Sequence, residues 1–349
     1  MAQIAKAAGV SQGAISSLLN DRDYGIRVSD KTRERVFKVC REMGYIPNDL
    51  RAVVRMYPEL GDFCLLFSAS IAGGVTHPFL GRIIQGAMSA VTDPSHPITI
   101  GTYTDQADYG HADPDNLPHP IRAGVASKLM CFGTPNLSLI HMLLRRGSPV
   151  VSLGTDVPVA GVLSLVPDYA MAAQLAVEHL FKLGHEHLAI VSGPFGTTDQ
   201  QTLELHRGVK LAYDDFGISI DAQNIVYGDL SYAAGANALD NLLGHPVKPT
   251  AILCLSDAAA AGVLMQALSR GIRVPEQLSI VGCGDDFCSS MVIPGLTTAH
   301  LPAEEMARVG VHEIERLVRE PLAAEPRKQI MAVRLIERAS SGPVPPKLG

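Results

Sequence analysis

The sequence contains no tryptophan, and nine tyrosines and nine phenylalanines make up an aromatic fraction of only 5% of its 349 residues. No apolar run reaches the roughly 20 residues that a membrane-spanning helix needs. The N-terminus lacks the charged start and the apolar stretch of a signal peptide. None of the six cysteines belongs to a CxxC pair, and most fall in expected strands or helices, which indicates buried free thiols in a reducing compartment. These absences predict a cytoplasmic protein with no membrane partner.

Charge is scarce as well, because Lys, Arg, Asp and Glu together make up 18% of the chain. The net charge of −6 argues against nucleic-acid binding over the whole surface. Residues 1–55, however, hold ten Lys and Arg against six Asp and Glu, a net charge of +4, so the other 294 residues carry −10. A basic head on an acidic body suits local contact with phosphates. With 47% hydrophobic residues, the chain is long enough for a small module and a large two-lobed core.

Residues 3–20 predict two short helices that meet at a glycine turn. Gly9 stands where the turn needs a residue that tolerates positive φ, and Ser11 is a good N-cap for the second helix. The apolar residues recur at helical spacing on one side, at Ile4, Ala5, Ala8, Val10, Ile15, Leu18 and Leu19. The opposite face is short, polar and uncharged. In a DNA-binding helix-turn-helix this face of the second helix lies in the major groove, whereas a helical hairpin packed in some other core is the structural alternative.

A third helix is predicted over residues 29–44, with Ser29 as its N-cap and Gly44 as its end. Its apolar stripe of Val36, Val39 or Cys40, and Met43 can close a three-helix core. Residues 49–55 could form one further short helix. An isolated segment of that length should remain largely unfolded until something packs against it.

From Phe63 onward, short apolar runs alternate with amphipathic stretches, as in FCLLF followed by PFLGRIIQGAMSAV and LAIVSG followed by LELHRGVKLAYDDFG. Strand followed by helix, many times over, predicts parallel sheets covered by helices on both faces. The series occurs twice, which predicts two doubly wound lobes. Ligands of such sheets bind at the carboxyl ends of the strands, so the cleft between the lobes is the expected site.

The sequence offers little catalytic or metal chemistry. Between Thr102 and Ala126 lies an acidic, proline-rich stretch that predicts a loop with room for one short turn. Its His111 and His119, near two aspartates, could bind a metal, but their irregular spacing favours a solvated loop. The stretch VGCGDD lacks the third glycine of a dinucleotide fingerprint, and no GxSxG nucleophile elbow occurs. We therefore expect no metal, no cofactor and no enzymatic activity.

The order of these parts resembles the LacI/GalR family of bacterial transcription regulators. In the head, the resemblance is carried by IAKAAGVS, AISSLLN, VSDKTRERV and GYIPN. In the body it is carried by HPFLGRIIQGAM, LGHEHLAIVSGP, AILCLSDAAAAGVLMQALSRGIRVPEQLSIVG, IPGLTTA and RLIERASSG. The resemblance implies an all-α helix-turn-helix head and an α/β core of two doubly wound parallel-sheet lobes, akin to the periplasmic sugar-binding proteins.

The resemblance also implies domain boundaries. We expect a DNA-binding domain at 1–47, a hinge helix and linker at 48–61, and a ligand-binding and dimerisation core at 62–338. Within the core, lobe 1 takes about 62–164 and 301–324, and lobe 2 about 165–300 and 325–338. Residues 339–349 are rich in proline and predict a flexible tail without the heptads of a tetramerising coiled coil.

The function that the resemblance implies is sequence-specific control of transcription. We expect a dimeric, effector-controlled repressor that binds a near-palindromic operator on double-stranded DNA, in the bacterial cytoplasm and on the nucleoid when bound. In that family the hinge folds on DNA and wedges a leucine pair into the minor groove, which places Val54 as the wedge. Many members also have arginine where Ser17 stands. The residues assigned to DNA contact are Ser11, Gln12, Gly13, Ser16, Ser17, Asn20, Arg27, Arg51 and Val54.

The effector is less defined than the DNA-binding head. Sugar-responsive members carry Arg, Asn, Asp and Gln where this chain has Leu205, Ser256, Gly284 and Leu301, so an ordinary sugar effector is not expected. Arg207, Asp285 or Asp286 could substitute if the local register shifts. The candidate effector residues are Phe79, Leu205, Arg207, Ser256, Gly284, Asp285 and Leu301. Two alternatives stay open: a core that is only a dimer platform, and a cytoplasmic small-molecule-binding module whose head is vestigial.

Overall fold

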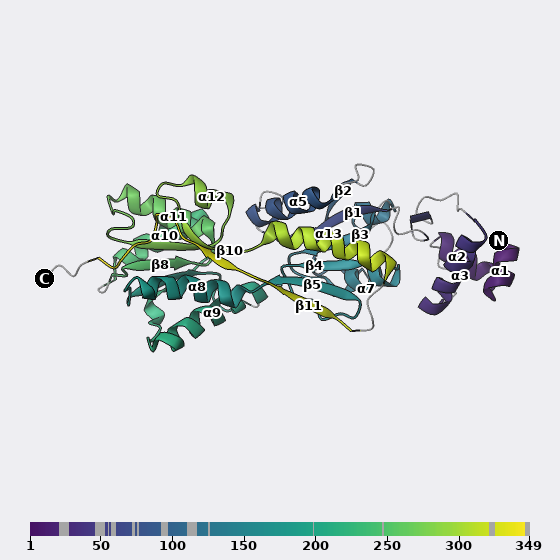
Figure 1. The fold of residues 1–349 in the computed structure, drawn as a ribbon, viewed down its shortest axis with the longest axis horizontal. Helices are drawn as coiled ribbons and strands as arrows, with labels where there is room; N and C mark the ends of the chain where they lie inside the picture. Colours follow the sequence, from purple (N-terminus) through teal and green to yellow (C-terminus); the bar gives the residue numbers. More distant parts are fainter. Residues whose placement is uncertain are drawn as a thin grey trace. The chain divides into compact units, whose positions relative to one another are not determined.

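The chain forms two compact units in the computed structural model (Figure 1). The first contains Met1–Leu165 and Glu304–Gln329, and the second contains Val166–Ala303 and Ile330–Gly349. The structure describes residues 1–20, 28–45, 53–54, 56, 61–71, 74, 77–91, 97–109, 117–124, 126–197, 199–245, 248–320 and 325–345. Within these ranges, no helix is both long and apolar enough to cross a membrane.

Three helices form the N-terminal head: α1 Ala2–Ala8, α2 Gln12–Asn20 and α3 Asp30–Glu42. Gly9 ends α1 with a φ of 62°, a left-handed conformation that glycine adopts without steric cost. Ser11 accepts a hydrogen bond from the amide of Ala14 at 3.1 Å, and Ser29 accepts one from the amide of Thr32 at 3.3 Å. Both hydroxyls satisfy helix amides that would otherwise lack a partner. The predicted helix-turn-helix and third helix are therefore present.

The core of the head includes one residue from beyond the three helices. Its fully or nearly buried members are Ile4, Ala5, Ala8, Ile15, Leu19, Val36, Phe37, Cys40 and Met56. Met56 has no exposed surface, and the Arg41 guanidinium donates to its carbonyl oxygen at 2.8 Å. Met43, which was expected in this core, is 46% exposed because α3 ends before it and the chain turns at Gly44.

Lobe 1 is built on a six-stranded sheet in the order β11-β5-β4-β3-β1-β2. The four neighbouring pairs among β1 to β5 are parallel. Most of these strands are apolar almost throughout, as expected for a sheet that is covered on both faces. They are β1 Asp62–Ser68, β2 Ile98–Tyr103, β3 Ala126–Phe132, β4 Val150–Leu153, β5 Val162–Pro167 and β11 Arg327–Met331.

Helices cover the two faces of this sheet. On one face, α7 (Leu137–Arg145) packs against alternate residues of β1 and β3. On the other, α5 (Pro78–Ala90) and α13 (Ala303–Arg319) lie side by side (Figure 1). The Arg82 guanidinium donates to both carboxylate oxygens of Glu304, at 2.8 and 2.7 Å, which fixes α5 against α13. The short helix α6 (His119–Arg122) lies in the stretch that was predicted as a loop, and His111 with its neighbouring aspartates lies outside the described residues.

Lobe 2 contains a second six-stranded sheet in the order β12-β10-β9-β8-β6-β7, in which only β12 pairs in an antiparallel manner. Its strands are β6 Leu188–Ser192, β7 Ile225–Tyr227, β8 Ala251–Cys254, β9 Ser279–Gly284, β10 Thr297–His300 and β12 Arg334–Ile336. Its helices are α8 Tyr169–Lys182, α9 Gln200–Phe216, α10 Tyr232–Leu243, α11 Asp257–Ser269 and α12 Phe287–Met291, with a 3-10 turn at Ala222–Asn224. The predicted class, a helical head with two doubly wound parallel-sheet lobes, is confirmed.

Glycines bring the helices of lobe 2 into close pairs, with α8 and α9 on one face of the sheet and α10 and α11 on the other (Figure 1). A Cβ at Gly208 of α9 would lie 1.9 Å from the carbonyl oxygen of Ala170 in α8. At Gly235 of α10, it would lie 2.0 Å from the carbonyl oxygen of Ala259 in α11. Each contact requires a residue without a side chain, so these glycines set the helix spacing.

The C-terminal stretch is bonded to lobe 2 over part of its length, which corrects the prediction of a flexible tail from residue 339. Ser340 is fully buried and donates to the carbonyl oxygen of Ile280 at 2.6 Å. His185, whose side chain is buried, contacts the carbonyl oxygen of Gly342 at 3.0 Å. Burial lowers the pKa of His185, so it is a neutral core residue. The sequence did not reveal this role because the partners of His185 and Ser340 are 60 to 157 residues away along the chain.

Strand order predicts a ligand position in each sheet. In lobe 1, the chain runs from β1 to β2 on one side and then to β3 on the other. In lobe 2, it runs from β6 to β7 on one side and then to β8 on the other. Ligands of open α/β sheets bind at the carboxyl ends of the strands where this reversal occurs. The residues at the ends of β1, β3, β6 and β8 are therefore the candidates for ligand contact.

Candidate DNA-binding face and effector site

The exposed face of α2 is polar and carries no charge. Gln12 and Gly13 are exposed, and Ser16 and Ser17 are half-buried. Ala14, Ile15 and Leu19 fill the head core on the other side of the helix. The side chains that face outward therefore offer hydroxyl and amide groups, which can donate to and accept from base edges in the major groove.

The remaining predicted DNA-contacting residues divide into two groups. Arg27 and Arg51 lie outside the described residues, and Asn20 ends α2 with its side chain also outside them. Val54 is described and is only 6% exposed. One of its methyl groups lies near Gly61, as does the hydroxyl of Ser127 in β3. In this conformation Val54 is covered, so a wedge role requires it to leave Gly61.

Two residues near the hinge were not singled out from the sequence. Met56 was expected in a segment without a core of its own, yet its side chain completes the head core. Arg41 is the second, because its guanidinium donates to the carbonyl oxygen of Met56. The apolar character of Met56 was the available signal, and its packing against the three helices depends on contacts that no local pattern specifies.

At the reversal point of lobe 1, one aspartate is held by two serine hydroxyls. Ser68 ends β1 and is fully buried, and it donates to one carboxylate oxygen of Asp105. Ser70 donates to the other oxygen of the same carboxylate. Charge-assisted hydrogen bonds of this kind fix the direction of a carboxylate. The arrangement gives lobe 1 a rigid acceptor at the carboxyl end of its sheet.

Lobe 1 also carries a cluster of three rings, two of them near the start of α5 and one at the end of β3. Phe79, in the first turn of α5, stacks on Phe132 at the end of β3, with 5.5 Å between ring centroids. The ring of His77 lies 6.2 Å from Phe132. Burial lowers the pKa of His77, which favours its neutral form. Phe79 itself is 7% exposed, so it supports the ring of Phe132 more than it offers a surface of its own.

At the reversal point of lobe 2, a serine and a histidine form a close pair. Ser192 ends β6 and is fully buried, and its hydroxyl lies 2.5 Å from Nε2 of His206 on α9. Burial lowers the pKa of His206. Leu205, the preceding residue, is 1% exposed and belongs to the core. The hydrogen-bonding side chain at this place is therefore His206 and not the residue that alignment by motif selected.

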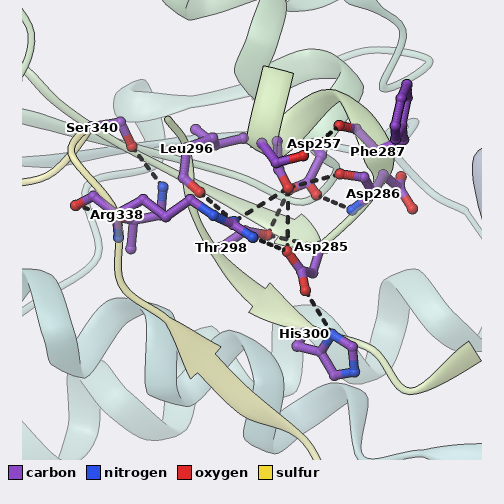
Figure 2. A network of polar contacts seen from close by, with 12 residues as sticks. Asp257, Asp285, Asp286, Phe287, Leu296, Thr298, His300, Arg338 and Ser340 are labelled. Atoms are coloured by element: carbon purple, nitrogen blue, oxygen red, sulfur yellow. Dashed lines mark hydrogen bonds and ion pairs between the residues drawn. The ribbon is translucent and has the colours of Figure 1, made fainter. Parts of the chain in front are cut away.

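The ends of β9 and β10 carry a buried network around Asp257, the first residue of α11 (Figure 2). Asp257 accepts hydrogen bonds from the hydroxyl of Thr298 at 2.6 Å and from the amide of Asp286 at 2.7 Å. Burial, together with the nearby negative charge of Asp286, raises the pKa of Asp257 to about 7. The network fastens the chain after β9 to the start of α11.

Asp285 lies next to this network and links three segments of lobe 2 (Figure 2). Its φ of 58° is in the left-handed region, which is strained for a residue with a side chain. Its carboxylate accepts from Arg338 at 2.6 Å and is 2.8 Å from Nδ1 of His300. Although its burial opposes ionisation, bonds from His300 and Arg338 lower its pKa well below the usual range. Asp285 is thus an ionised structural anchor with both oxygens engaged.

The other predicted effector residues are placed as follows. Leu301 is 3% exposed, and Gly284 is a buried residue with a φ of 144°. The Ser256 hydroxyl caps α11 and donates to the carbonyl oxygen of Leu230 at 2.7 Å. Arg207 is exposed and donates to Glu204 at 2.7 Å. Leu301 and Gly284 bring no polar side chain, the Ser256 hydroxyl is engaged, and Arg207 is paired with Glu204, so these four residues do not form a polyol site within lobe 2.

No group of three or more His, Cys, Asp or Glu side chains is arranged to hold a metal ion among the described residues. The residues that sequence reasoning missed here are Asp105, His206 and Asp257. Asp105 follows an expected strand and Asp257 begins a helix, which is the signal that could have marked them, whereas His206 lies inside α9 and has no such signal. Their partners, however, lie in other elements.

Comparison with known proteins gives two family matches. Residues 1–48 match the model described as bacterial regulatory proteins, lacI family. Residues 177–341 match the model described as a periplasmic binding protein-like domain. The first match covers the whole of α1, α2 and α3, and the second covers most of lobe 2.

Relatives over nearly the full length are repressors. The HTH-type transcriptional repressor CytR of Escherichia coli K12 is 29% identical over 319 residues, which cover 88% of this chain and 86% of that protein. The ribose operon repressor of the same organism is 25% identical over 343 residues, covering 98% and 99%. A solved LacI family transcriptional regulator from Enterococcus faecium, with bound ribose, has a TM-score of 0.68 at 19% identity and covers 81% and 99%. That last likeness shows the fold alone.

Proposed function

We propose that the chain is a member of the lacI family of bacterial regulatory proteins and acts as a dimeric, effector-controlled repressor of a near-palindromic operator. The observation that carries this proposal is the exposed, uncharged polar face of α2, whose opposite side packs into the head core. The N-terminal part of such a helix reaches base edges in the major groove. We propose that the protein works in the bacterial cytoplasm, on the nucleoid when bound, and performs no catalysis.

Specific contacts follow from the geometry of α2. Gln12 can bond an adenine edge with both groups of its amide, and Ser11, Ser16 and Ser17 can bond either kind of base. Gly13 has no side chain, so the backbone of α2 can approach the DNA closely at this position. Beyond α2, Asn20, Arg27 and Arg51 would position the head on the phosphates, and Val54 would enter the minor groove after leaving Gly61.

The effector is proposed to bind at the carboxyl ends of the strands. Within lobe 1 these ends present the Asp105 carboxylate and the ring of Phe132. Within lobe 2 they present the Ser192 and His206 pair. An effector that prefers one of two states of the core shifts the equilibrium for DNA binding by its difference in affinity, and DNA shifts effector binding by the same factor.

The proposed partner in the dimer is a second copy of this chain. Large apolar side chains after β9 are exposed: Phe287 by 75%, Met291 by 64% and Ile293 by 84%. Clustered exposed apolar residues of this kind mark interaction sites. Two copies related by a two-fold axis would present two heads to two half-sites. Ile293→Asp should reduce the sedimentation coefficient to that of a monomer, and an unchanged dimer would exclude this surface as the interface.

Selection of genomic DNA fragments by the purified full-length protein, at physiological salt, tests the proposal. A variant with both Gln12→Ala and Ser17→Ala should be treated in parallel. The proposal expects a recovered palindrome that the double variant no longer selects. If the protein enriches no sequence, with or without cell extract to supply a corepressor, the chain is a small-molecule-binding module with a vestigial head.

A further inference from the structure

The Ser192 and His206 pair lies where the strand order of lobe 2 reverses. Ser192 is the last residue of β6, and β7 and β8 lie on opposite sides of that strand. His206 reaches this point from α9, the helix that follows β6. Since ligands of open α/β sheets bind at such reversals, a polar side chain here is placed to meet one.

The burial of Ser192 fixes the hydrogen positions in the pair. Ser192 has no exposed surface, and among the described residues its hydroxyl bonds only to Nε2 of His206, at 2.5 Å. A buried hydroxyl hydrogen without an acceptor is costly, so the hydroxyl must donate to Nε2. Nε2 is then an acceptor without a hydrogen, and the neutral ring carries its hydrogen on Nδ1. The lowered pKa of His206 agrees with a neutral ring.

The other ring nitrogen is available. Nδ1 of His206 bonds to no group in the described part of the chain, and it is not among the buried polar atoms that lack a partner. It is therefore open to solvent and acts as an N–H donor. We infer that His206 donates a hydrogen bond from Nδ1 to the effector, and that the effector presents there an uncharged acceptor, a carbonyl oxygen or a ring nitrogen. This inference rests on the proposed function.

Charges near the pair disfavour an anionic group. Asp199 precedes α9 and Asp229 follows β7, so both lie in segments that leave the carboxyl ends of neighbouring strands. Arg207, the adjacent cation, is paired with Glu204. The cation adjacent in sequence is therefore already engaged and offers a carboxylate or phosphate on the ligand little counter-charge, whereas a neutral acceptor needs none.

The surroundings also disfavour a polyol. A Cβ at Gly193, directly after Ser192, would meet the methyl group of Thr202 at 3.0 Å and a methyl group of Leu230 at 3.7 Å. The Thr202 hydroxyl donates to Asp199, and the Ser256 hydroxyl is engaged by Leu230 and by its own helix. Sugar hydroxyls placed here would lose water without gaining partners. A flat, largely apolar ring with one or two acceptors fits the single donor and the methyl groups.

The test has two measurements on the full-length protein. Long-range proton–nitrogen NMR of the histidine rings, with His206 assigned from a His206→Phe variant, reports the tautomer. It should show hydrogen on Nδ1 and none on Nε2. Hydrogen on Nε2 at pH 7.5 would overturn the inference, because the donor would then face Ser192.

The second measurement is a ligand-detected NMR titration with 2-pyridone, uracil and 2-piperidone as neutral carbonyl probes and ribose as the polyol probe. The carbonyl probes should bind more tightly than ribose, and His206→Phe should weaken them about 3- to 10-fold, the effect of one hydrogen bond. Lys210→Ala, one turn further along α9 in an exposed pair with Asp214, is the matched control and should change nothing.

Each other outcome rejects the inference. Equal affinity in wild type and His206→Phe, tighter binding of ribose, or no binding of any carbonyl probe would each contradict it. The genomic DNA selection is independent of these readouts. If the protein selects a palindrome but the carbonyl probes do not bind through His206, the proposal of a transcription regulator is kept and the assignment of His206 is rejected. If the probes bind through His206 but no DNA sequence is selected, the proposal of a transcription regulator is rejected instead.

Discussion

Two helical glycines show how strongly the effect of one added methyl group on stability depends on its surroundings. A Cβ at Gly208 would lie 1.9 Å from a backbone oxygen of α8, whereas a Cβ at Gly81 of α5 would meet nothing within 4 Å. Gly208→Ala should therefore separate α8 from α9 and destabilise the protein by about 2–3 kcal/mol. Gly81→Ala should stabilise it by about 0.5–1 kcal/mol, because alanine loses less backbone entropy in a helix.

Urea unfolding followed by circular dichroism measures both effects, since the chain has no tryptophan to report by fluorescence. The two variants make the same chemical change, so the difference between them isolates the close helix contact. Equal stability of the two variants would show that α8 and α9 are not packed as described.

Individual residues also mark the limit of sequence reasoning at the site. Gly9, Ser11 and Ser29 were predicted correctly because each role depends only on neighbours within three residues. The role of His206 was missed because it is set by Ser192, fourteen residues earlier and on another element. Motif alignment pointed to Leu205, and a shift of one position on α9 exchanges a buried face for a polar one.

At the scale of elements, the connection between α11 and the end of β9 should respond to pH. The pKa of Asp257 is about 7 in the folded protein, against about 3.9 in an unfolded chain. A raised carboxyl pKa contributes stability that is present below pH 4 and is lost as the pH rises through 7. Ionised Asp257 should thus cost up to about 4 kcal/mol, an upper limit set by this difference.

Asp257→Asn removes this titration. The free energy of unfolding of the variant, relative to wild type, should rise between pH 5 and pH 9, even if the variant is weaker throughout because an amide offers one acceptor oxygen to Thr298 and Asp286. Asp214→Asn, on the exposed face of α9, is the control. Its free energy of unfolding should change with pH in parallel with that of wild type. Parallel curves for Asp257→Asn as well would mean that the carboxyl does not titrate in this range.

The segment after α3 differs most from the sequence-based expectation, because it contributes a residue to the head core. Met56 is fully buried in the head, whereas Met43 is 46% exposed. Met56→Ala should destabilise the head by about 2–4 kcal/mol, and Met43→Ala should cost less than about 0.5 kcal/mol. Hydrogen exchange of the α1 to α3 amides measures this directly. Equal exchange in the two variants would show that Met56 does not belong to the head core.

Secondary structure and fold class could be predicted across most of the chain because strand and helix periodicities are local. The alternation after Phe63 indicated two parallel sheets, and the structure contains them. Met56, Ser340 and His185 could not be placed, since each packs against a segment distant in sequence. Local patterns specify elements, whereas their contacts depend on the assembled fold.

The whole molecule joins a basic head to an acidic core, and its parts serve two kinds of ligand. The head carries the polar face of α2, and lobes 1 and 2 each carry polar groups at a strand reversal. A repressor requires that the head distinguish base sequence and that the core change its own state on effector binding. The second requirement depends on the first, because an effector has nothing to regulate if the head does not recognise a DNA sequence.

The central claim is that the exposed face of α2 reads bases, and selection from a random DNA library at physiological salt tests it most directly. Gln12→Ala should change the preferred base at one position in each half-site and cost about 1–3 kcal/mol there. Arg35→Ala, an exposed cation on α3, should weaken all sequences alike and reduce the salt dependence. If Gln12→Ala instead weakens every sequence equally and leaves the preferred bases unchanged, α2 is not the reading helix.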